Sequence, residues 1–425
     1  MKKRGHGCLF WSCEASERNK LMSTSLLYHG WGVRGYRQVA VDFGEGMIGF
    51  RVEQDPDTFR CSHCGSGDVM KSGQVVRRFR SLPIGGKAVW IELPVRRLWC
   101  TDCGKVRQAK VGFADQRRGY THAFERYALE LSRHMTIKDV ARHLGVGWDA
   151  VKDIQKRNLQ RRFGRPKLKY LKHLAVDEIG VGKGHRYLTV VLDLDEGAVV
   201  FVGEGKGADA LKPFWKRLRS SGARVKAVAT DMSPAYTAAV RENLPKAVHV
   251  FDRFHVVKLF NEKLSLLRQE LQREAEGPLQ KKVLKGTRWL LLKNPENLIE
   301  EKDEKRRLEE ALALNKPLAA AYYMKEDLRQ VWERPTIAAA ELFLDDWVAR
   351  GRASGVRMLM KFAETLVEHR RGILNYYLYP ITTAALEGTN NKIKTMQRQA
   401  YGFRDKEFFK LKIYALHETR YALVG

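Results

Sequence analysis

The sequence predicts an α/β protein in which a mixed sheet is interrupted by a long helical segment and preceded by two smaller modules. Short apolar runs at residues 174–177, 187–194 and 198–202, separated by turn signals, predict three hairpin-linked strands. Helical and strand patterns then alternate through residues 208–251, which is typical of a mixed sheet with helices on its faces. Residues 255–380 have helical patterns throughout, so we expect them to form an all-helical insertion.

The charge of the chain indicates a polyanionic partner. Its 425 residues include 77 Lys and Arg against 49 Asp and Glu, a formal net charge of +28. The excess is concentrated at the front, because residues 1–170 hold 33 basic and 16 acidic residues, a difference of 17. Basic side chains displace counterions from a phosphate backbone, so this distribution favours nucleic acid. A basic protein with ordinary solvated faces is the alternative.

The remaining composition narrows the class of protein. An apolar content of 44 % excludes a largely disordered chain. No apolar run approaches the roughly 18 residues of a membrane helix, and the first 20 residues lack a secretory signal. We therefore expect a cytoplasmic protein with no membrane partner. Residues 1–21 differ from the rest and precede a second methionine, Met22, so we interpret them as an extension.

Four of the six cysteines form two CxxC pairs, whereas Cys8 and Cys13 stand apart. In a chain without a signal peptide, such pairs predict metal binding rather than disulfides. Strand-like residues 75–80 and 88–93 flank a glycine pair, so we predict a zinc ribbon within residues 22–115. Four thiolates suit a closed structural Zn²⁺ site, with free or catalytic thiols as the alternative. The predicted ligands are Cys61, Cys64, Cys100 and Cys103.

The pattern of residues 116–166 predicts a helix-turn-helix. Ala141, Gly145 and Val151 have its spacing, with the turn at the glycine. We place the first helix at residues 137–144 and the recognition helix near 148–159. A helical hairpin without a DNA role is the alternative. The candidate DNA-binding residues are Trp148, Lys152, Lys156, Arg157, Arg161 and Arg162.

Two aspartates follow short apolar strands. Asp177 closes residues 174–177, and Asp231 follows residues 225–230. Neighbouring strands of one sheet can place such carboxylates side by side, where their hard oxygens suit Mg²⁺. A third carboxylate would allow two metal ions to act on one phosphodiester. The alternative is that each aspartate caps the next helix, which Ser233 and Pro234 fit well.

From about Met22 onward, the chain resembles the ISL-three family of bacterial insertion-sequence transposases. The CxxC pairs and the helix-turn-helix carry part of this resemblance. The short segments AVDE, TDMS and DRFH at residues 175–178, 230–233 and 252–255 carry another part. The most specific part is LEGTNNKIK at residues 386–394, followed by RQAYGF at 398–403.

The resemblance implies an RNase H-like catalytic domain over residues 167–425, with a helical insertion at about 262–375. It implies that Asp177, Asp231 and Glu387 form a DDE triad that binds Mg²⁺ or Mn²⁺. The expected reaction is metal-dependent cleavage of DNA, followed by attack of the freed 3′ hydroxyl on target DNA. The expected partners are double-stranded terminal inverted repeats and target DNA, bound by a homodimer in the bacterial cytoplasm at the nucleoid.

Four further residues are candidates for supporting roles. Asp252 and His255 follow a strand, where we expect His255 to orient a metal-bound water or a DNA phosphate, or the two residues to form the N-terminus of a helix. Asn391 and Lys394 share a helix face with Glu387. We expect Asn391 to contact DNA or to steady Glu387, and Lys394 to hold a phosphate near the cut bond or to be a solvated surface residue. The glycines at 180–184 lack the Lys-Ser/Thr pair of a P-loop, so we expect a hairpin turn and no nucleotide cofactor.

Two other functions fit the same motifs. A DNA-binding regulator would keep the ribbon and the helix-turn-helix without catalysis. A nuclease would cut DNA without joining it. Cleavage with Mg²⁺ separates the transposase from the regulator, and strand-transfer products separate it from the nuclease.

Overall fold

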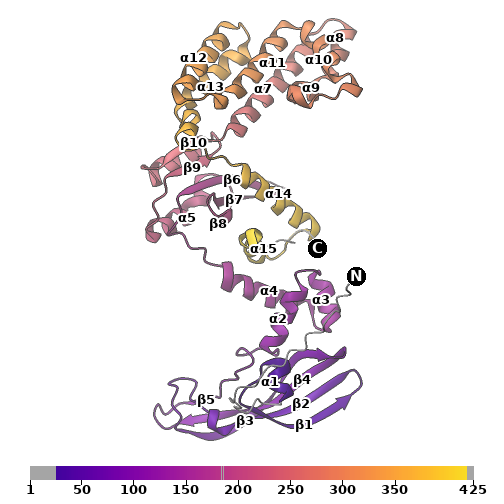
Figure 1. Ribbon diagram of the computed structural model, residues 1–425, viewed down its shortest axis with the longest axis vertical. Helices are drawn as coiled ribbons and strands as arrows, with labels where there is room; N and C mark the ends of the chain where they lie inside the picture. The colour runs from indigo at the N-terminus through magenta and orange to yellow at the C-terminus, as the bar shows by residue number, and fades with distance from the viewer. Residues whose placement is uncertain (1–24, 183, 185, 419–425) are drawn as a thin grey trace, which may run out of the picture. The chain divides into compact units, whose positions relative to one another are not determined.

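A computed structural model describes residues 25–182, 184 and 186–418 (Figure 1). The chain forms two compact units, residues 1–155 and residues 156–425. The predicted extension, with Cys8 and Cys13, lies outside the described residues. Among those that are described, no helix is long and apolar enough to span a membrane.

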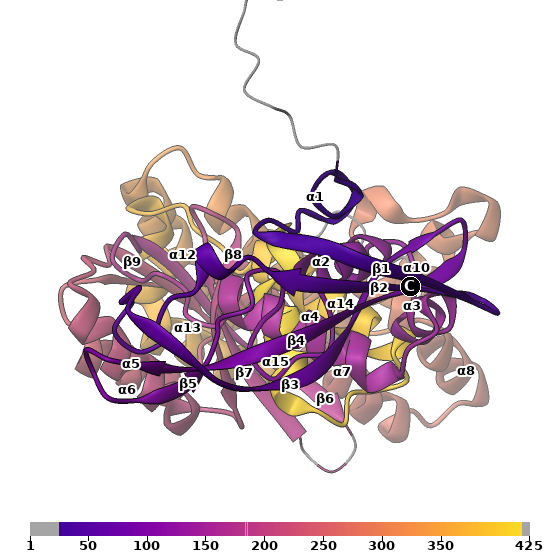
Figure 2. The same cartoon turned by 90° about the horizontal axis from the view of Figure 1, so that it is seen from below.

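The sheet of the first unit has the order β1-β2-β4-β3, with β5 paired to β4. Gly85 and Gly86 have φ of 54° and 79°, so the predicted turn joins β3 to β4, whose strands run side by side in Figure 2. Both strands are longer than predicted, and β1 and β2 were not predicted. The elements are α1 (Leu26–Trp31), β1 (Tyr36–Gly44), β2 (Met47–Gln54), β3 (Val69–Ile84), β4 (Lys87–Cys100) and β5 (Val106–Gln108).

The helix-turn-helix follows, and its last helix runs across the boundary between the two units. The helices are α2 (His122–Leu131), α3 (Ile137–Leu144) and the longer α4 (Trp148–Phe163), so the predicted positions are confirmed. The Thr136 hydroxyl accepts a hydrogen bond from the Asp139 N–H and starts α3. Gly145 ends α3 with a φ of 61°, a left-handed conformation that glycine adopts without steric cost.

The sheet of the second unit has the order β10-β9-β6-β7-β8. Strands β6, β7 and β8 are antiparallel, and β9 and β10 run parallel to β6, which confirms the predicted mixed sheet. The strands are β6 (His173–Gly182), β7 (Arg186–Asp193), β8 (Ala198–Glu204), β9 (Ala227–Thr230) and β10 (Val248–Phe251). The helices between them are α5 (Ala208–Ser221) and α6 (Pro234–Asn243).

A helical insertion separates β10 from the last two helices. Its core includes Phe260, Trp347 and Phe362, with the two phenylalanine rings 4.8 Å apart, edge to face. The helices are α7 (Arg253–Glu274), α8 (Pro278–Gly286), α9 (Arg288–Leu292), α10 (Glu304–Ala313), α11 (Lys316–Arg329), α12 (Ile337–Ala353) and α13 (Arg357–Leu374).

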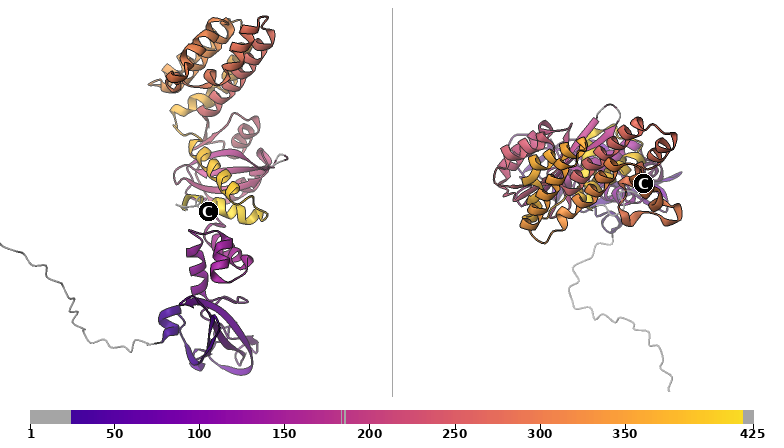
Figure 3. Two further views of the ribbon diagram at one scale, coloured as in Figure 1. Left: turned by 90° about the vertical axis from the view of Figure 1, so that its right-hand side faces the viewer. Right: turned by 90° about the horizontal axis from the view of Figure 1, so that it is seen from above.

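Helices α14 (Ala384–Gln399) and α15 (Lys406–Tyr414) close the chain. They are drawn in yellow in Figures 1 and 3, where they lie against the sheet. Leu386 and Ile393 of α14 join a core with Ala175 of β6 and Ala229 of β9. The C-terminal block therefore packs directly on the strands that carry the predicted aspartates.

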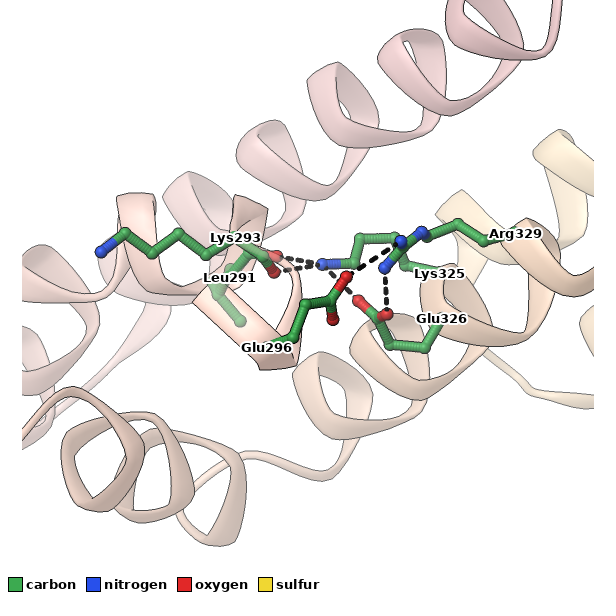
Figure 4. A network of polar contacts seen from close by, with 6 residues as sticks. All are labelled: Leu291, Lys293, Glu296, Lys325, Glu326 and Arg329. Carbon is green, nitrogen blue, oxygen red and sulfur yellow. Dashed lines mark hydrogen bonds and ion pairs between the residues drawn. The ribbon is translucent and has the colours of Figure 1, made fainter. Parts of the chain in front are cut away.

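A buried lysine ties the insertion together (Figure 4). Lys325 is 1 % exposed, and its ammonium donates hydrogen bonds to the carbonyl oxygens of Leu291 and Lys293 at 2.8 and 3.1 Å. It also pairs with Glu326 at 2.7 Å, and Arg329 pairs with the same carboxylate. Burial lowers the pKa of Lys325. The lysine thus satisfies carbonyl groups at the end of α9 that would otherwise be buried unpaired.

Replacing this lysine is expected to weaken the insertion. Lys325→Met keeps the side-chain volume but leaves two carbonyls without their donor, at a cost of about 3 kcal/mol. Urea unfolding is the measurement, and Lys361→Met, at an exposed position of α13, is the matched control. Equal unfolding midpoints in the two variants would contradict the role assigned to Lys325.

Candidate active site

Asp177 lies within β6 rather than at the end of a strand, so the predicted position was wrong. The strand continues to Gly182 because it pairs with β7 along that length. Its pairing with β9, however, stops at Ala175 and Ala229. Asp177 therefore lies just past the shared edge, where the sheet opens and a carboxylate can meet residues from other elements.

The register of the parallel strands brings the two aspartates together. Ala175 lies opposite Ala229, and each aspartate comes two residues later, Asp177 within β6 and Asp231 directly after β9. Their charges interact. Burial raises the pKa of Asp177, and the Asp231 carboxylate raises it further, whereas the Glu178 N–H, His255 and Lys258 act in the opposite direction.

Asp231 does not cap α6, because the N-cap residue of that helix is Ser233, but one oxygen of Asp231 is held by the turn before the helix. Its Oδ1 accepts a hydrogen bond from the Ser233 N–H at 3.0 Å, just before α6. An Asx turn of this kind occupies one oxygen of the carboxylate. The capping alternative is therefore wrong at Asp231, and the turn uses only one of its two oxygen atoms.

The N-terminus of α7 faces the same place. Asp252 is 1 % exposed and accepts a hydrogen bond from the Phe254 N–H, which confirms the helix-cap reading. Its other oxygen accepts a hydrogen bond from the Thr383 hydroxyl, at the N-terminal end of α14. Asp252 thus ties the starts of α7 and α14 together. His255 and Lys258, in the first turns of α7, lie close enough to act on the charge of Asp177.

Helix α14 contributes a side-chain amide that was not among the predicted site residues. Asn390 is 6 % exposed, and its Nδ2 donates a hydrogen bond to Oδ2 of Asp177 at 2.9 Å. The other oxygen of Asp177 accepts from the Glu178 N–H at 2.7 Å. Both oxygens of this carboxylate are therefore oriented by donors, which fixes its rotamer.

Glu387 lies on α14 three residues before Asn390, and it is exposed. It shares this exposed face with Asn391 and Lys394, as predicted. The three carboxylates do not form a tight cluster. In the described part of the chain, one group of three or more potential metal ligands lies within 4.8 Å of one another, and it is the group of four cysteines. Carboxylates repel one another, so their close approach depends on cations between them.

The four cysteines of the two CxxC pairs do converge. Their sulfur atoms lie within 4.8 Å of one another, with Cys61 3.7 Å from Cys103 and Cys64 3.5 Å from Cys100. Zn–S bonds of roughly 2.3 Å place tetrahedral sulfurs about 3.8 Å apart, so the geometry fits Zn²⁺. The Cys64 and His63 N–H groups help to lower the pKa of Cys61 to about 6, and thiolate is the form that binds metal.

Three family models match the chain along its length. A transposase model, the DDE domain of the ISL3 family, matches residues 174–413, which is more than half of the chain. The helix-turn-helix domain of transposase family ISL3 matches residues 109–157. The zinc finger of transposases IS204, IS1001, IS1096 and IS1165 matches residues 57–103. The chain belongs to the ISL3 family of DDE transposases.

Curated relatives agree with this assignment. The transposase for insertion sequence element IS1001 of Bordetella parapertussis is 33 % identical over 91 % of this chain and 96 % of its own length. The transposase for element IS1557 of Mycobacterium tuberculosis is 28 % identical over 82 % of this chain and 83 % of its own length. A solved structure, the Drosophila P element transposase strand transfer complex, matches at 13 % identity over 63 % of this chain and 81 % of that chain. Its TM-score of 0.31 is too low to support a structural conclusion.

The predicted DNA-binding residues of the transposase lie on or beside α4, in different surroundings. Trp148 is 47 % exposed, and the Lys152 ammonium lies 5.4 Å from its ring centre. Lys156 instead pairs with Asp405 and Glu407 at 3.1 and 2.6 Å. Arg161 bonds to Asn158 within the helix, and Arg162 pairs with Glu418. Arg157 also has an interaction partner.

The sequence pattern around Asn390 indicates that its side chain is buried. Leu386, Asn390 and Ile393 follow the i, i+4, i+7 spacing of one helix face, and that face is the buried one. The amide at position 390 therefore had to point inward and that of Asn391 outward. Lys258 left no such signal, because its role depends on where α7 starts relative to the sheet.

Replacing Asn390 is expected to impair the transposase through Asp177. Asn390→Ala removes a donor to a carboxylate, and losses of this kind cost roughly 10- to 100-fold in metal affinity or activity. The measurement is the Mn²⁺ concentration that gives half-maximal DNA cleavage, which should rise. Asn297→Ala, at an exposed asparagine of the helical insertion, is the control and should leave this concentration unchanged. The assignment fails if both variants respond alike.

Proposed function

We propose that this transposase serves a bacterial insertion sequence, where it cuts the ends of the element and joins them to target DNA. The observation that carries the proposal is that Asp177 lies close enough to Asp231 for their charges to interact and accepts a hydrogen bond from Asn390 of α14, within the segment that matches the DDE family model. The relatives named as insertion-sequence transposases support it. An RNase H-like domain is the fold we propose. Its support is three antiparallel strands followed by two strands parallel to the first.

Asp177, Asp231 and Glu387 would hold Mg²⁺ or Mn²⁺, which supply Lewis-acid stabilisation of the phosphodiester when bound. The two aspartates offer hard oxygen atoms at one sheet edge. Asn390 keeps Asp177 in a single orientation, so no reorganisation is needed when DNA arrives. The positive end of α7, with His255 and Lys258, faces the same point and would contact a DNA phosphate.

The proposed reaction has two phosphoryl-transfer steps. In the first, water displaces the 3′ oxygen of one strand at the end of the element and frees a 3′ hydroxyl. In the second, that hydroxyl displaces an oxygen of a target phosphodiester in line. Neither step needs a covalent bond to the enzyme. The chain contributes mainly positioning and charge, which are the main sources of rate enhancement in phosphoryl transfer.

DNA binding is assigned to the first unit and to α4. We propose that Trp148 and Lys152 approach the terminal inverted repeats, since that tryptophan is exposed. We also propose that Arg157, Arg161 and Arg162 contact the DNA, although Arg162 pairs with Glu418 in this structure. Lys156 would have to leave Asp405 and Glu407 before it could bind a phosphate. A homodimer on paired ends, acting in the cytoplasm at the nucleoid, completes it.

The test uses the full-length protein and a linear DNA that carries the repeats flanking its gene. With Mg²⁺ or Mn²⁺, we expect strand breaks at the repeat boundary and, with added target DNA, joined products. Binding without cleavage would instead support the DNA-binding regulator. Cleavage without joining would support the nuclease. Either outcome contradicts the proposed transposition.

A further inference from the structure

Helix α14 has two distinct faces. Leu386, Asn390, Ile393 and Met396 are buried against the second unit. The opposite side carries Glu387, Asn391, Lys394 and Arg398, all exposed and spaced by four, three and four residues. This spacing places them in one stripe along the helix. The stripe starts at the glutamate of the proposed triad.

The stripe ends at a tyrosine with an unusual backbone. Tyr401 follows the last turn of α14 with a φ of 50°, and its side chain is fully exposed. Residues other than glycine adopt this conformation at a steric cost. The Gly402 N–H bonds to the Gln397 carbonyl at 2.9 Å, which holds the chain in this turn. Neither backbone preference nor packing accounts for a large aromatic side chain at this position.

The same segment is basic. Between Glu387 and Asp405 there is no acidic residue, whereas Lys392, Lys394, Arg398 and Arg404 are all exposed. None of these four side chains forms an ion pair with another residue that the structure describes. A polyanion would therefore find unneutralised positive charge along the stripe.

We propose that the stripe from Glu387 to Tyr401 is a track for one DNA strand, on which Tyr401 stacks against an unpaired base. Lys394 and Arg398 would contact the phosphates between the two ends of the track. From Glu387 to Gln399, the last residue of α14, twelve residues at 1.5 Å each span about 18 Å, and Tyr401 lies two residues further along the chain. At 3.4 Å per nucleotide, this corresponds to roughly five or six nucleotides from the cut phosphate. The inference rests on the proposed function, because it takes Glu387 as the active-site end.

Stacking on an aromatic ring tolerates any base sequence, so it can be measured without knowing the repeats. The probe is a DNA duplex with a ten-nucleotide single-stranded thymidine tail, compared with the same duplex carrying an abasic tail. The ratio of the two dissociation constants isolates contacts to bases, because duplex and phosphate contacts are common to both probes. It is measured with the full-length, zinc-loaded protein in buffer without added Mg²⁺ or Mn²⁺, where no cleavage is expected.

For the unaltered protein, we expect the thymidine tail to bind on the order of tenfold more tightly than the abasic tail. Tyr401→Phe should keep this ratio, and Tyr401→Gly should lose most of it. Glycine is favoured at a φ of 50°, so this variant should fold at least as well. Tyr170→Ala, at another exposed tyrosine of the same unit, is the control and should not change the ratio.

An unchanged ratio in Tyr401→Gly would overturn the inference. A loss that is equal in Tyr401→Phe and Tyr401→Gly would also overturn it, because phenylalanine keeps the stacking surface. The outcome is separable from that of the proposed function. The ratio of the two dissociation constants requires no catalysis, so Asp231→Asn should show the same ratio as the unaltered protein. The binding result can therefore be interpreted even if the cleavage assay fails.

Discussion

Asp231→Asn is expected to abolish DNA cleavage while leaving DNA binding intact. The substitution keeps the side-chain shape and the acceptor for the Ser233 N–H, but it removes the negative charge beside Asp177. Loss of a metal ligand costs several kcal/mol of transition-state stabilisation. Because each 1.4 kcal/mol is a tenfold change in rate, we expect the cleavage rate to fall roughly a thousandfold.

The measurement is the rate of strand cleavage at saturating DNA, together with the dissociation constant of the same DNA. Asp209→Asn is the control, since Asp209 is an exposed carboxylate of α5 that pairs with Lys212. It should cut like the unaltered protein. Cleavage by Asp231→Asn within tenfold of the control would refute the metal-binding role of Asp231.

Cys100→Ser is expected to remove the zinc ion and unfold the ribbon. Cys100 is fully buried at the end of β4, and its sulfur lies 3.5 Å from that of Cys64. Structural zinc contributes about 10–16 kcal/mol to the folding of small zinc domains. A ribbon that loses one of its four ligands would lose much of that free energy, because the serine hydroxyl does not replace the thiolate as a zinc ligand.

Zinc content and the circular dichroism of the purified protein are the measurements. We expect about one zinc per chain in the unaltered protein and close to none in Cys100→Ser, with a loss of strand signal. Cys8→Ser is the control, because Cys8 belongs to neither CxxC pair. A Cys100→Ser protein that keeps one zinc per chain and its strand signal would contradict the ribbon assignment.

Local patterns predicted most of the fold. Helix α3 begins and ends at the predicted residues, and the strands of the second unit differ from the prediction by a few residues. These elements are marked by caps, glycines and apolar runs that act over short distances. Strands β1 and β2 were missed. The parallel pairing of β2 with β4 joins segments far apart in sequence, which no local pattern reveals.

The site was less predictable than the fold. Asp177 was expected at a strand end because its apolar run stops there, but pairing with β7 extends the strand to Gly182. Whether Asp177 faces Asp231 depends on the register of β6 and β9, which is a property of the folded sheet. The sequence alone also left the roles of Asp252 and Asn391 open. In the folded chain Asp252 is a helix cap, and Asn390 rather than Asn391 donates the hydrogen bond to Asp177.

The most direct test of the three-carboxylate site is DNA cleavage by Glu387→Gln, because Glu387 lies on a helix and its two partners lie on the sheet. We predict that cleavage falls to the level of Asp231→Asn while DNA binding is unchanged. Glu262→Gln, at an exposed position of α7, should cut normally. Cleavage by Glu387→Gln at the rate of that control would contradict the assignment of Glu387 to the site.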